Sequence, residues 1–346
     1  MNNNFKVYFV FEFSEEPRGG VFQFTKALKE YLSNLNLVTD DPDKADIFFI
    51  NAFLFLDEIL RLKLKYKDKV FIHRIDGPIR LYNKKNDIRD IYVNMINKQI
   101  ADATVFQSNW SKNKSYKMGI FKKKYEATIT NAPNSNIFNQ SGKYKDNNLE
   151  KIKLISTSWS SNWKKGFEVY QWIDENLDFD KFEMTFIGNS PIKFKNIIYK
   201  KPMNSVELAS ELKNNDIFIT ASQKDPCSNS LIEAMHCGLP AIVLNDGGHP
   251  EIIGLAGEKF IRTNEIPNLI EKISSNYENY YKKINLPSLE DIGEQYKIFF
   301  IDVLKEKSKK NNTKKFNLLI YYKMKIKIFF LKIYSKSIKF MDKKGK

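Results

Sequence analysis

The chain has 346 residues, of which 42% are hydrophobic and 28% are charged, and its formal net charge is +15 at pH 7. This length suits two α/β domains, and this composition excludes disorder along the whole chain. The charge is uneven, because residues 305–346 carry +13 and the remainder carries only +2. A nearly neutral body lacks the excess of cations needed to follow a nucleic-acid backbone, so we expect no nucleic-acid partner.

Cysteine usage and the N-terminal residues bear on the cell compartment. Cys227 and Cys237 are the only cysteines. On one helix they would lie about 15 Å apart, which is beyond disulfide reach. The first residues, MNNNFKVYFVFEF, have the pattern of a first β-strand rather than that of a signal peptide. We therefore expect a cytoplasmic protein.

Short apolar runs of strand length alternate with longer stretches of helical spacing. The runs are residues 5–13, 46–51, 69–73, 103–107, 152–157, 182–187, 216–220 and 240–244. This alternation predicts an α/β protein with two doubly wound parallel sheets. The polar interval 139–151 predicts the linker. We expect an N-terminal acceptor domain in residues 1–143 and a donor domain in residues 144–304, whose last helix can pack back on the first. Residues 305–346 form a basic apolar tail.

The segment 214–254 combines a strand, a polar loop and a helix predicted from about Pro226 to Cys237. Asp225 and Glu233 then lie about 12 Å apart along the axis, which is comparable to the length of a sugar diphosphate nucleoside. The helix start would receive the diphosphate, Asp225 the sugar hydroxyls and Glu233 the ribose diol. Two alternatives stay open: Asp225 is a plain N-cap before Pro226, or Glu233 faces solvent.

This segment resembles the carboxylate signature of family 4 glycosyltransferases. The matching residues are Asp225, Glu233, Gly238, Leu239, Pro240, Gly247, Gly248, Pro250 and Glu251. The resemblance covers roughly residues 5–300. It implies a GT-B fold, in which two Rossmann-like domains face each other across a cleft, and a retaining enzyme that uses a nucleotide sugar. Asp225 departs from the pattern, because the family more often has Glu there.

Further donor-binding residues are expected around this helix and after two strands. Ser228, Asn229 and Ser230 fall in the first turn of the predicted helix, and Gly19 and Gly20 follow the first strand. Lys165 and Gly166 match a Lys-Gly pair of the resembled family, whose Lys neutralises the departing diphosphate. Ser160 stands where the family often adds an Arg. The alternatives are a structural turn at the two glycines and a solvated lysine at Lys165.

The first half offers acceptor-side candidates at expected strand ends. His73, Arg74 and Asp76 close the strand in KVFIHRIDGP, and Ser108 follows the strand in ADATVFQSNWS. Open α/β sheets place their chemistry at such carboxyl ends. We expect a catalytic role for His73, beside Lys165, Asp225 and Glu233, and acceptor contacts for Arg74, Asp76 and Ser108. A structural histidine and simple helix capping by Ser108 are the alternatives.

The expected reaction needs no metal, because the sequence has neither an Asp-x-Asp in a metal-binding context nor a His/Cys ligand cluster. We expect a sugar to pass from a nucleotide-diphosphate sugar to a glycan or lipid-linked acceptor in surface polysaccharide or glycolipid synthesis. The alternatives are a non-catalytic nucleotide-sugar or polyanion binder on a degenerate GT-B scaffold and a GT-B nucleotide-sugar epimerase.

The tail mixes apolar residues with lysines and has no uninterrupted apolar run long enough to span a bilayer. Lys325, Lys332, Lys336 and Lys339 share one helical face, whereas Lys323 and Lys327 lie nearly opposite. We expect binding to an anionic membrane surface, on the inner face of the cytoplasmic membrane, and keep a solubilising or partner-binding tail as the alternative.

Overall fold

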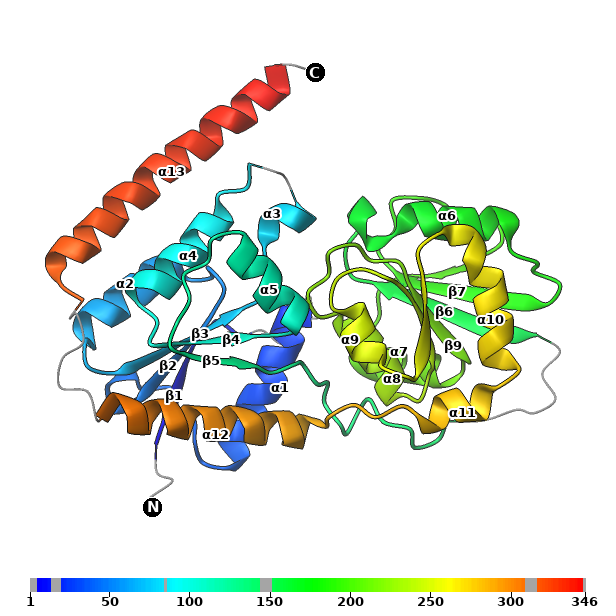
Figure 1. The fold of residues 1–346 in the computed structure, drawn as a ribbon, viewed down its shortest axis with the longest axis horizontal. Helices are drawn as coiled ribbons and strands as arrows, with labels where there is room; N and C mark the ends of the chain where they lie inside the picture. The colour runs from blue at the N-terminus through cyan, green and yellow to red at the C-terminus, as the bar shows by residue number, and fades with distance from the viewer. Residues whose placement is uncertain (1–4, 14–19, 84–85, 144–150, 309–315, 345–346) are drawn as a thin grey trace. The chain divides into compact units, whose positions relative to one another are not determined.

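The computed structural model describes residues 5–13, 20–83, 86–143, 151–308 and 316–344, with side chains as far as residue 338 (Figure 1). The chain divides into two compact units. Unit 1 comprises residues 1–12, 29–129 and 293–346, and unit 2 comprises residues 13–28 and 130–292. Residues 144–150, inside the predicted linker, lie outside the described residues. Among the described residues, no helix has the length and hydropathy to cross a membrane.

Unit 1 is built on a five-stranded parallel sheet. Its strands, in spatial order, are β1 (Val7–Val10), β2 (Ile47–Asn51), β3 (Val70–Ile75), β4 (Ala103–Phe106) and β5 (Tyr125–Thr128). Every residue of β2, β3 and β4 is buried, as expected for parallel strands covered on both faces.

Helices cover both faces of this sheet (Figure 1). One face carries α2 (Leu56–Lys65), α4 (Arg89–Gln99), α5 (Asn109–Lys117) and, further out, α13 (Leu318–Lys344). On the other face, Phe300 of α12 (Leu289–Ser308) packs against Phe5 and Phe49. The chain from residue 293 onward thus belongs to the body of unit 1. A short helix, α3 (Ile79–Tyr82), follows β3.

Unit 2 contains a six-stranded parallel sheet in the order β11-β10-β9-β6-β7-β8. The strands are β6 (Ile152–Ser158), β7 (Phe182–Gly188), β8 (Ile198–Lys200), β9 (Ile217–Thr220), β10 (Ala241–Leu244) and β11 (Gly257–Phe260). Strand order reverses between β6 and β9, which are adjacent in space but separated in sequence by β7 and β8. Such a reversal is the switch point at which open α/β sheets bind ligands.

The core of unit 2 has one apolar layer on each side of the sheet. The first layer involves α7 (Ser205–Lys213), α8 (Asn229–His236) and α9 (His249–Ile253). The second involves α6 (Phe167–Asn176), α10 (Ile266–Ser274) and α11 (Tyr277–Lys282). The remaining long helix, α1 (Gly20–Asn34), contributes its residues as far as Leu28 to unit 2.

The two doubly wound parallel sheets confirm the predicted fold class. All eight predicted strands are present, and β5, β8 and β11 were not predicted. These three lie at sheet edges and are short, with polar or half-exposed residues that carry no apolar run.

Candidate active site

The switch point of unit 2 brings together two charged residues that are distant in sequence. Lys165 lies in a short 3-10 helix, η2 (Trp163–Lys165), which follows β6, and Asp225 lies in the loop after β9. The Nζ of Lys165 donates a hydrogen bond to Oδ2 of Asp225 at 2.9 Å. An ammonium–carboxylate pair therefore stands at the carboxyl ends of two adjacent strands.

Local sequence explains why these two loops touch. The side chain of Asn162 accepts a hydrogen bond from the backbone N–H of Lys164 and so starts the 3-10 turn. Gly166 ends the turn with a φ of 94°, and a Cβ built there would lie 2.4 Å from the Cβ of Ala221. Only glycine combines this conformation with this close approach. The backbone N–H of Gln223 then donates to the carbonyl of Lys164 at 2.7 Å.

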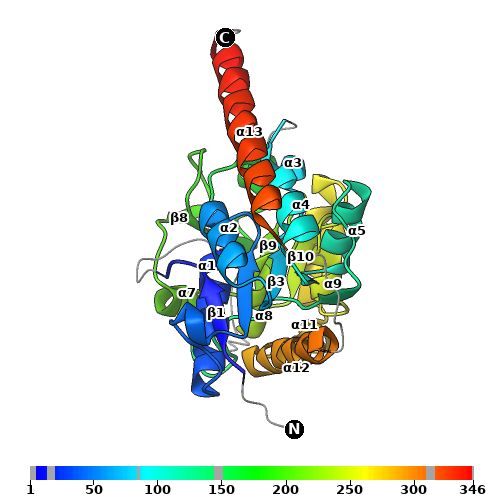
Figure 2. The same cartoon turned by 90° about the vertical axis from the view of Figure 1, so that its left-hand side faces the viewer.

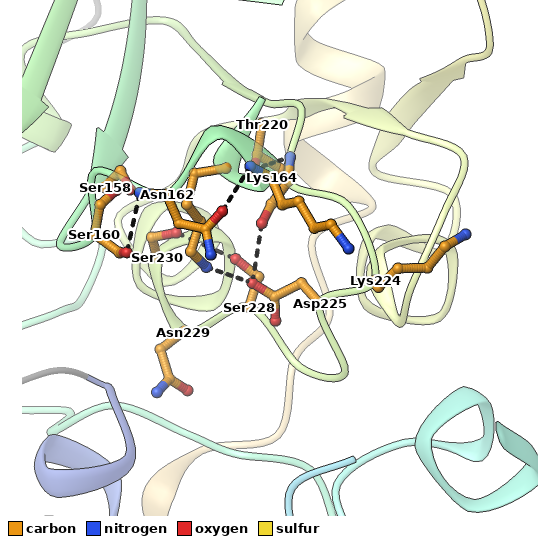
Figure 3. A network of polar contacts seen from close by, with 12 residues as sticks. Ser158, Ser160, Asn162, Lys164, Thr220, Lys224, Asp225, Ser228, Asn229 and Ser230 are labelled. Atoms are coloured by element: carbon orange, nitrogen blue, oxygen red, sulfur yellow. Dashed lines mark hydrogen bonds and ion pairs between the residues drawn. The ribbon is translucent and has the colours of Figure 1, made fainter. Parts of the chain in front are cut away.

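Asp225 is buried and has several partners. Its side chain also accepts hydrogen bonds from Ser222 Oγ at 3.3 Å and from the backbone N–H of Cys227 at 3.2 Å. Burial alone would raise the pKa of Asp225, but the charge of Lys165, the field of His249 and these hydrogen bonds lower it below its usual value. Asp225 is thus held as a carboxylate. Figure 3 labels Asp225 together with Ser228 and Ser230 in one network of polar contacts.

The helix after this loop begins later than predicted. It starts at Asn229, with Ser228 as N-cap, so Pro226 is outside the helix and the interpretation of Asp225 as a plain N-cap is wrong. The 3.2 Å bond from Cys227 N to Asp225 folds residues 225–227 into a turn instead. Glu233 then lies only about 6 Å along the axis from the helix start. The axial separation of about 12 Å expected between Asp225 and Glu233 does not apply, because Asp225 lies before the helix.

The start of α8 has the features of an anion-binding helix end. The first backbone N–H groups of a helix lack intrahelical partners, and the N-cap side chain of Ser228 makes no capping hydrogen bond here. The Oγ atoms of Ser228 and Ser230 lie 3.1 Å apart, and the two side chains flank this end (Figure 3). Lys165 adds a positive charge to the same loop cluster through its contact with Asp225. The arrangement suits a diphosphate.

Asn229, the first residue of α8, packs against the start of α1. Its Oδ1 accepts a hydrogen bond from Asn131 Nδ2 at 2.7 Å. A Cβ at Gly20 would overlap the amide group of Asn229, so glycine leaves the room that this side chain occupies. The other predicted loop glycine, Gly19, lies outside the described residues.

Glu233 is in a strongly desolvated position within α8. Its neighbours Ile232 and Ala234 are buried, and desolvation raises the pKa of Glu233 to about 8. The side chain keeps some contact with solvent. No hydrogen bond or ion pair involves its carboxyl group within the described ranges. A desolvated carboxyl group of this kind can accept hydrogen bonds from hydroxyl groups.

Three residues of the site were not singled out from the sequence, namely Lys224, Asp246 and His249. Lys224 has a left-handed backbone with φ of 54°, and both its N–H and its Nζ donate to Asp246, each at 3.0 Å. A non-glycine residue in this region is uncommon and is found in strained functional loops. His249 is fully buried in the Gly-Gly-x-Pro-Glu loop and its field acts on Asp225. The only signal in the sequence was their position inside the segment 214–254.

The acceptor-side candidates form a polar cluster in unit 1. Nη1 of Arg74 donates to Asp76 Oδ1 and to Asn51 Oδ1, both at 2.6 Å. Gln107 Nε2 also donates to Asp76 Oδ1 at 2.6 Å. The cluster lies at the carboxyl ends of β2, β3 and β4, as predicted for strand-end chemistry. Ser108 caps α5 by accepting a hydrogen bond from the N–H of Ser111 at 3.0 Å.

His73 does not lie at the carboxyl end of its strand. It is the fourth residue of β3 and is fully buried. Its Nε2 lies 2.8 Å from the carbonyl oxygen of Ala52, and its Nδ1 lies 3.2 Å from Asn97 Oδ1. Desolvation lowers the pKa of His73 to about 4 despite these contacts. This environment favours the structural alternative, so the catalytic role of His73 stays a prediction without geometric support.

The comparisons with known proteins come from family models and from solved structures. Residues 193–297 match the model of glycosyl transferases group 1. This range contains Asp225, α8, Glu233 and the Gly-Gly-x-Pro-Glu loop. The matched range is therefore similar to glycosyl transferases group 1, and it covers less than a third of the chain. A comparison with curated protein sequences returns no significant match.

Solved structures of glycosyltransferases have the same two-sheet fold as this chain. The catalytic domain of starch synthase IV from Arabidopsis thaliana, bound to ADP and acarbose, is 10% identical with a TM-score of 0.65, and the match covers 87% of this chain and 99% of that domain. HepE from Anabaena, in complex with UDP and glucose, is 13% identical with a TM-score of 0.62, covering 88% and 99%. Sucrose-phosphate synthase from Thermosynechococcus elongatus is 14% identical with a TM-score of 0.55, covering 93% and 81%. The fold is GT-B.

Proposed function

We propose that this glycosyltransferase moves a sugar, with retention and without a metal, from a nucleotide-diphosphate sugar to a hydroxyl group of a glycan or lipid-linked acceptor. One observation carries the proposal: Lys165 and Asp225 meet at the switch point of unit 2, beside the uncapped start of α8. An ammonium and the positive end of a helix suit a diphosphate, and the desolvated Glu233 suits a ribose diol.

The proposed transfer assigns a role to each of these groups. The bond between the anomeric carbon and the diphosphate oxygen breaks, and the acceptor oxygen bonds to the same face of the sugar. The acceptor proton passes to the departing phosphate oxygen. Lys165 and the first N–H groups of α8 stabilise the negative charge that develops on the diphosphate. Asp225 orients Lys165 and accepts hydrogen bonds from sugar hydroxyls.

The acceptor-side roles of Arg74, Asp76 and Ser108 belong to the same proposal. The Arg74–Asp76 pair already makes hydrogen bonds within unit 1, which fixes the orientation of the carboxylate. A fixed carboxylate at a strand end can accept a hydrogen bond from an acceptor hydroxyl. Surface polysaccharide or glycolipid synthesis is the setting that we infer for such an acceptor.

Binding and turnover can be tested separately. UDP, ADP and GDP are first added to the full chain, and each thermal midpoint is measured. One of them should raise the midpoint, since a ligand that binds only the folded state stabilises it. The corresponding nucleotide sugars are then assayed for transfer and for hydrolysis. Absence of any shift with all nucleotides and nucleotide sugars would overturn the proposal.

A matched pair of lysine variants tests the assigned chemistry. Lys165→Met should lower turnover about 10²- to 10³-fold, as expected for loss of one charge-stabilising donor. Lys181→Met removes an exposed lysine of the same unit, whose side chain is 69% accessible, and should leave turnover unchanged. A wild type that binds nucleotide sugars and turns none over would support the non-catalytic binder instead. Interconversion of the donor's sugar epimers would support the epimerase.

A further inference from the structure

The basic tail contains a helix that is attached to unit 1 by one of its faces. Met324 and Ile328 of α13 are buried in the same apolar cluster as Ile59 and Leu60 of α2. Lys325 Nζ also donates to Asp57 Oδ1 at 2.6 Å. The helix is therefore part of the folded unit. Its C-terminal end extends beyond the helices that it packs on (Figures 1 and 2).

The opposite face of α13 is apolar and exposed. With 100° per residue, most of its exposed large apolar side chains fall on one arc of about 100°, on the side away from Met324 and Ile328. The exposed residues of this arc are Leu319 (61%), Tyr322 (58%), Ile326 (56%), Phe329 (60%), Phe330 (63%) and Ile333 (46%). We call these six residues the outer face of α13. Contiguous exposed apolar residues of this kind mark interaction sites.

Lysines follow both borders of the outer face. Lys323 and Lys327 lie on one border, and Lys336 lies on the other. All three are exposed. No hydrogen bond or ion pair to any of these three ammonium groups is recorded in the part of the chain that the structure describes. Lys325 and Lys332, which lie between Lys336 and the packed face, pair with Asp57 instead.

Two apolar faces separated by two rows of lysine explain why the sequence places lysines on nearly opposite sides of this helix. A single hydrophobic direction cannot describe a helix that is apolar on opposite sides. Unit 1 covers one of these sides. The other side, with its flanking lysines, has the composition of a helix that lies in a membrane interface.

We propose that the outer face of α13 docks the protein on a bilayer containing anionic lipid. Its aromatic and aliphatic side chains would enter the boundary between headgroups and acyl chains, while the lysines on both borders reach the phosphates. A soluble polyanion would engage the lysines and leave the apolar arc uncovered. A second copy packed on this face would bring like-charged lysine rows together, which costs free energy. Charge and apolar area together therefore select an anionic membrane surface.

The test uses the full chain and two kinds of vesicle. One is phosphatidylcholine alone, and the other is phosphatidylcholine mixed with phosphatidylglycerol. The wild type should sediment with the mixed vesicles and much less with the neutral ones, and added salt should weaken the binding. The double variant Ile326→Ser, Phe329→Ser should lose most of the sedimentation. Its control, Leu255→Ser with Ile261→Ser, removes two residues of unit 2 that are each 74% exposed, and should bind as the wild type does.

A second pair of variants tests the charge. Lys323→Gln with Lys327→Gln should weaken binding to mixed vesicles roughly thirtyfold, since each lysine near an anionic surface contributes about fivefold. Lys193→Gln with Lys201→Gln makes the same change of charge on unit 2 and should have little effect. Failure of the wild type to bind mixed vesicles, or equal losses in variants and controls, would overturn the proposal. So would dimerisation of the wild type that the Ile326/Phe329 variant abolishes.

Discussion

Lys165 and Asp225 are sixty residues apart in the sequence, yet their side chains form a hydrogen-bonded ion pair at 2.9 Å. The pair joins the loop after β6 to the loop after β9, the two strands between which the sheet order reverses. The accessible fractions of the two side chains are 25% for Lys165 and 10% for Asp225. A diphosphate that binds here would therefore meet a lysine whose position is already fixed.

The first prediction concerns Asp225→Asn. The variant leaves Lys165 without a counter-charge, and we expect it to lose about 1–3 kcal/mol of unfolding free energy at neutral pH. The lowered pKa of Asp225 makes this contribution pH-dependent. Its stabilisation is present above the unfolded value, near pH 4, and is lost as the pH falls through the lower folded value. Urea unfolding near neutral pH and near pH 3 measures the loss of unfolding free energy and its dependence on pH.

The control for this variant is Asp178→Asn, which changes an exposed carboxylate of the same unit. Exposed ion pairs contribute little, so the control should change the urea midpoint much less than Asp225→Asn does at neutral pH. The difference between the wild type and Asp225→Asn should shrink in acid. A difference that is constant over this range would show that the loss arises from packing and not from the carboxylate charge.

The second prediction uses the raised pKa of Glu233, about 8. The folded protein holds this proton more tightly than the unfolded chain. Stability from this group is therefore complete below about pH 4.3 and is lost as the pH rises through 8. Glu233→Gln cannot ionise, so its unfolding free energy relative to the wild type should increase between about pH 4.3 and pH 8 and level off above that range. The slope should be at most about 1.4 kcal/mol per pH unit, and smaller because the side chain keeps some solvent contact.

Denaturant unfolding across this range, in buffers of constant ionic strength, provides the measurement. Glu271→Gln is a suitable control, because Glu271 is an exposed residue of α10. Its curve should parallel that of the wild type. If the Glu233→Gln curve is also parallel, Glu233 has an ordinary pKa in the folded protein, and the desolvated carboxyl group is not a feature of this site.

The sequence predicted the alternating fold well because central parallel strands are continuous apolar runs, as in β2 and β3. Edge strands such as β8 carry no such signal, since one side of the strand is unpaired. The start of α8 was misplaced because Asp225-Pro226 matches a common helix beginning. In the structure, the Asp225 carboxylate accepts hydrogen bonds from Lys165 and Ser222 instead of capping the helix. Such a long-range partner leaves no trace in local sequence.

His249 and Lys224 were missed for the same reason. Both act through residues of other loops, and the segment 214–254 that contains them gives neither residue a role of its own. The tail shows the opposite case. Its composition indicated an interfacial helix. Only the packing of Met324 on unit 1 shows which of its two apolar faces is covered and which is exposed.

The third prediction concerns Gly166→Ala. The added methyl group would meet Ala221 at 2.4 Å and its carbonyl oxygen at 2.7 Å, in a residue with φ of 94°. Backbone strain and overpacking together should cost about 2–4 kcal/mol, measured by urea unfolding. Gly142→Ala separates these two causes, since Gly142 has φ of 73° with nothing within 4 Å of the added atom. It should cost only about 1 kcal/mol. Equal losses in both variants would mean that the contact with Ala221 does not constrain the loop.

The fourth prediction distinguishes a structural from a catalytic His73. Because burial lowers the pKa of His73 to about 4, the folded protein resists protonating it. Its stabilisation is present above the unfolded value, near pH 6.5, and is lost as the pH falls toward 4. His73→Leu also removes the partner of the Ala52 carbonyl, so it should lose about 1–3 kcal/mol near pH 7 and less near pH 5.

Turnover provides the complementary measurement for this variant. If His73 only holds the Ala52 carbonyl inside unit 1, the folded His73→Leu enzyme should keep kcat within a few-fold of the wild type for whichever nucleotide sugar the wild type uses. A general acid or base would instead contribute about 10²- to 10⁴-fold. A fall of that size, with unfolding free energy unchanged, would restore the catalytic role predicted from the sequence. It would also require the ring to leave its contact with Ala52 during the reaction, because a nitrogen 2.8 Å from that carbonyl cannot serve a substrate at the same time.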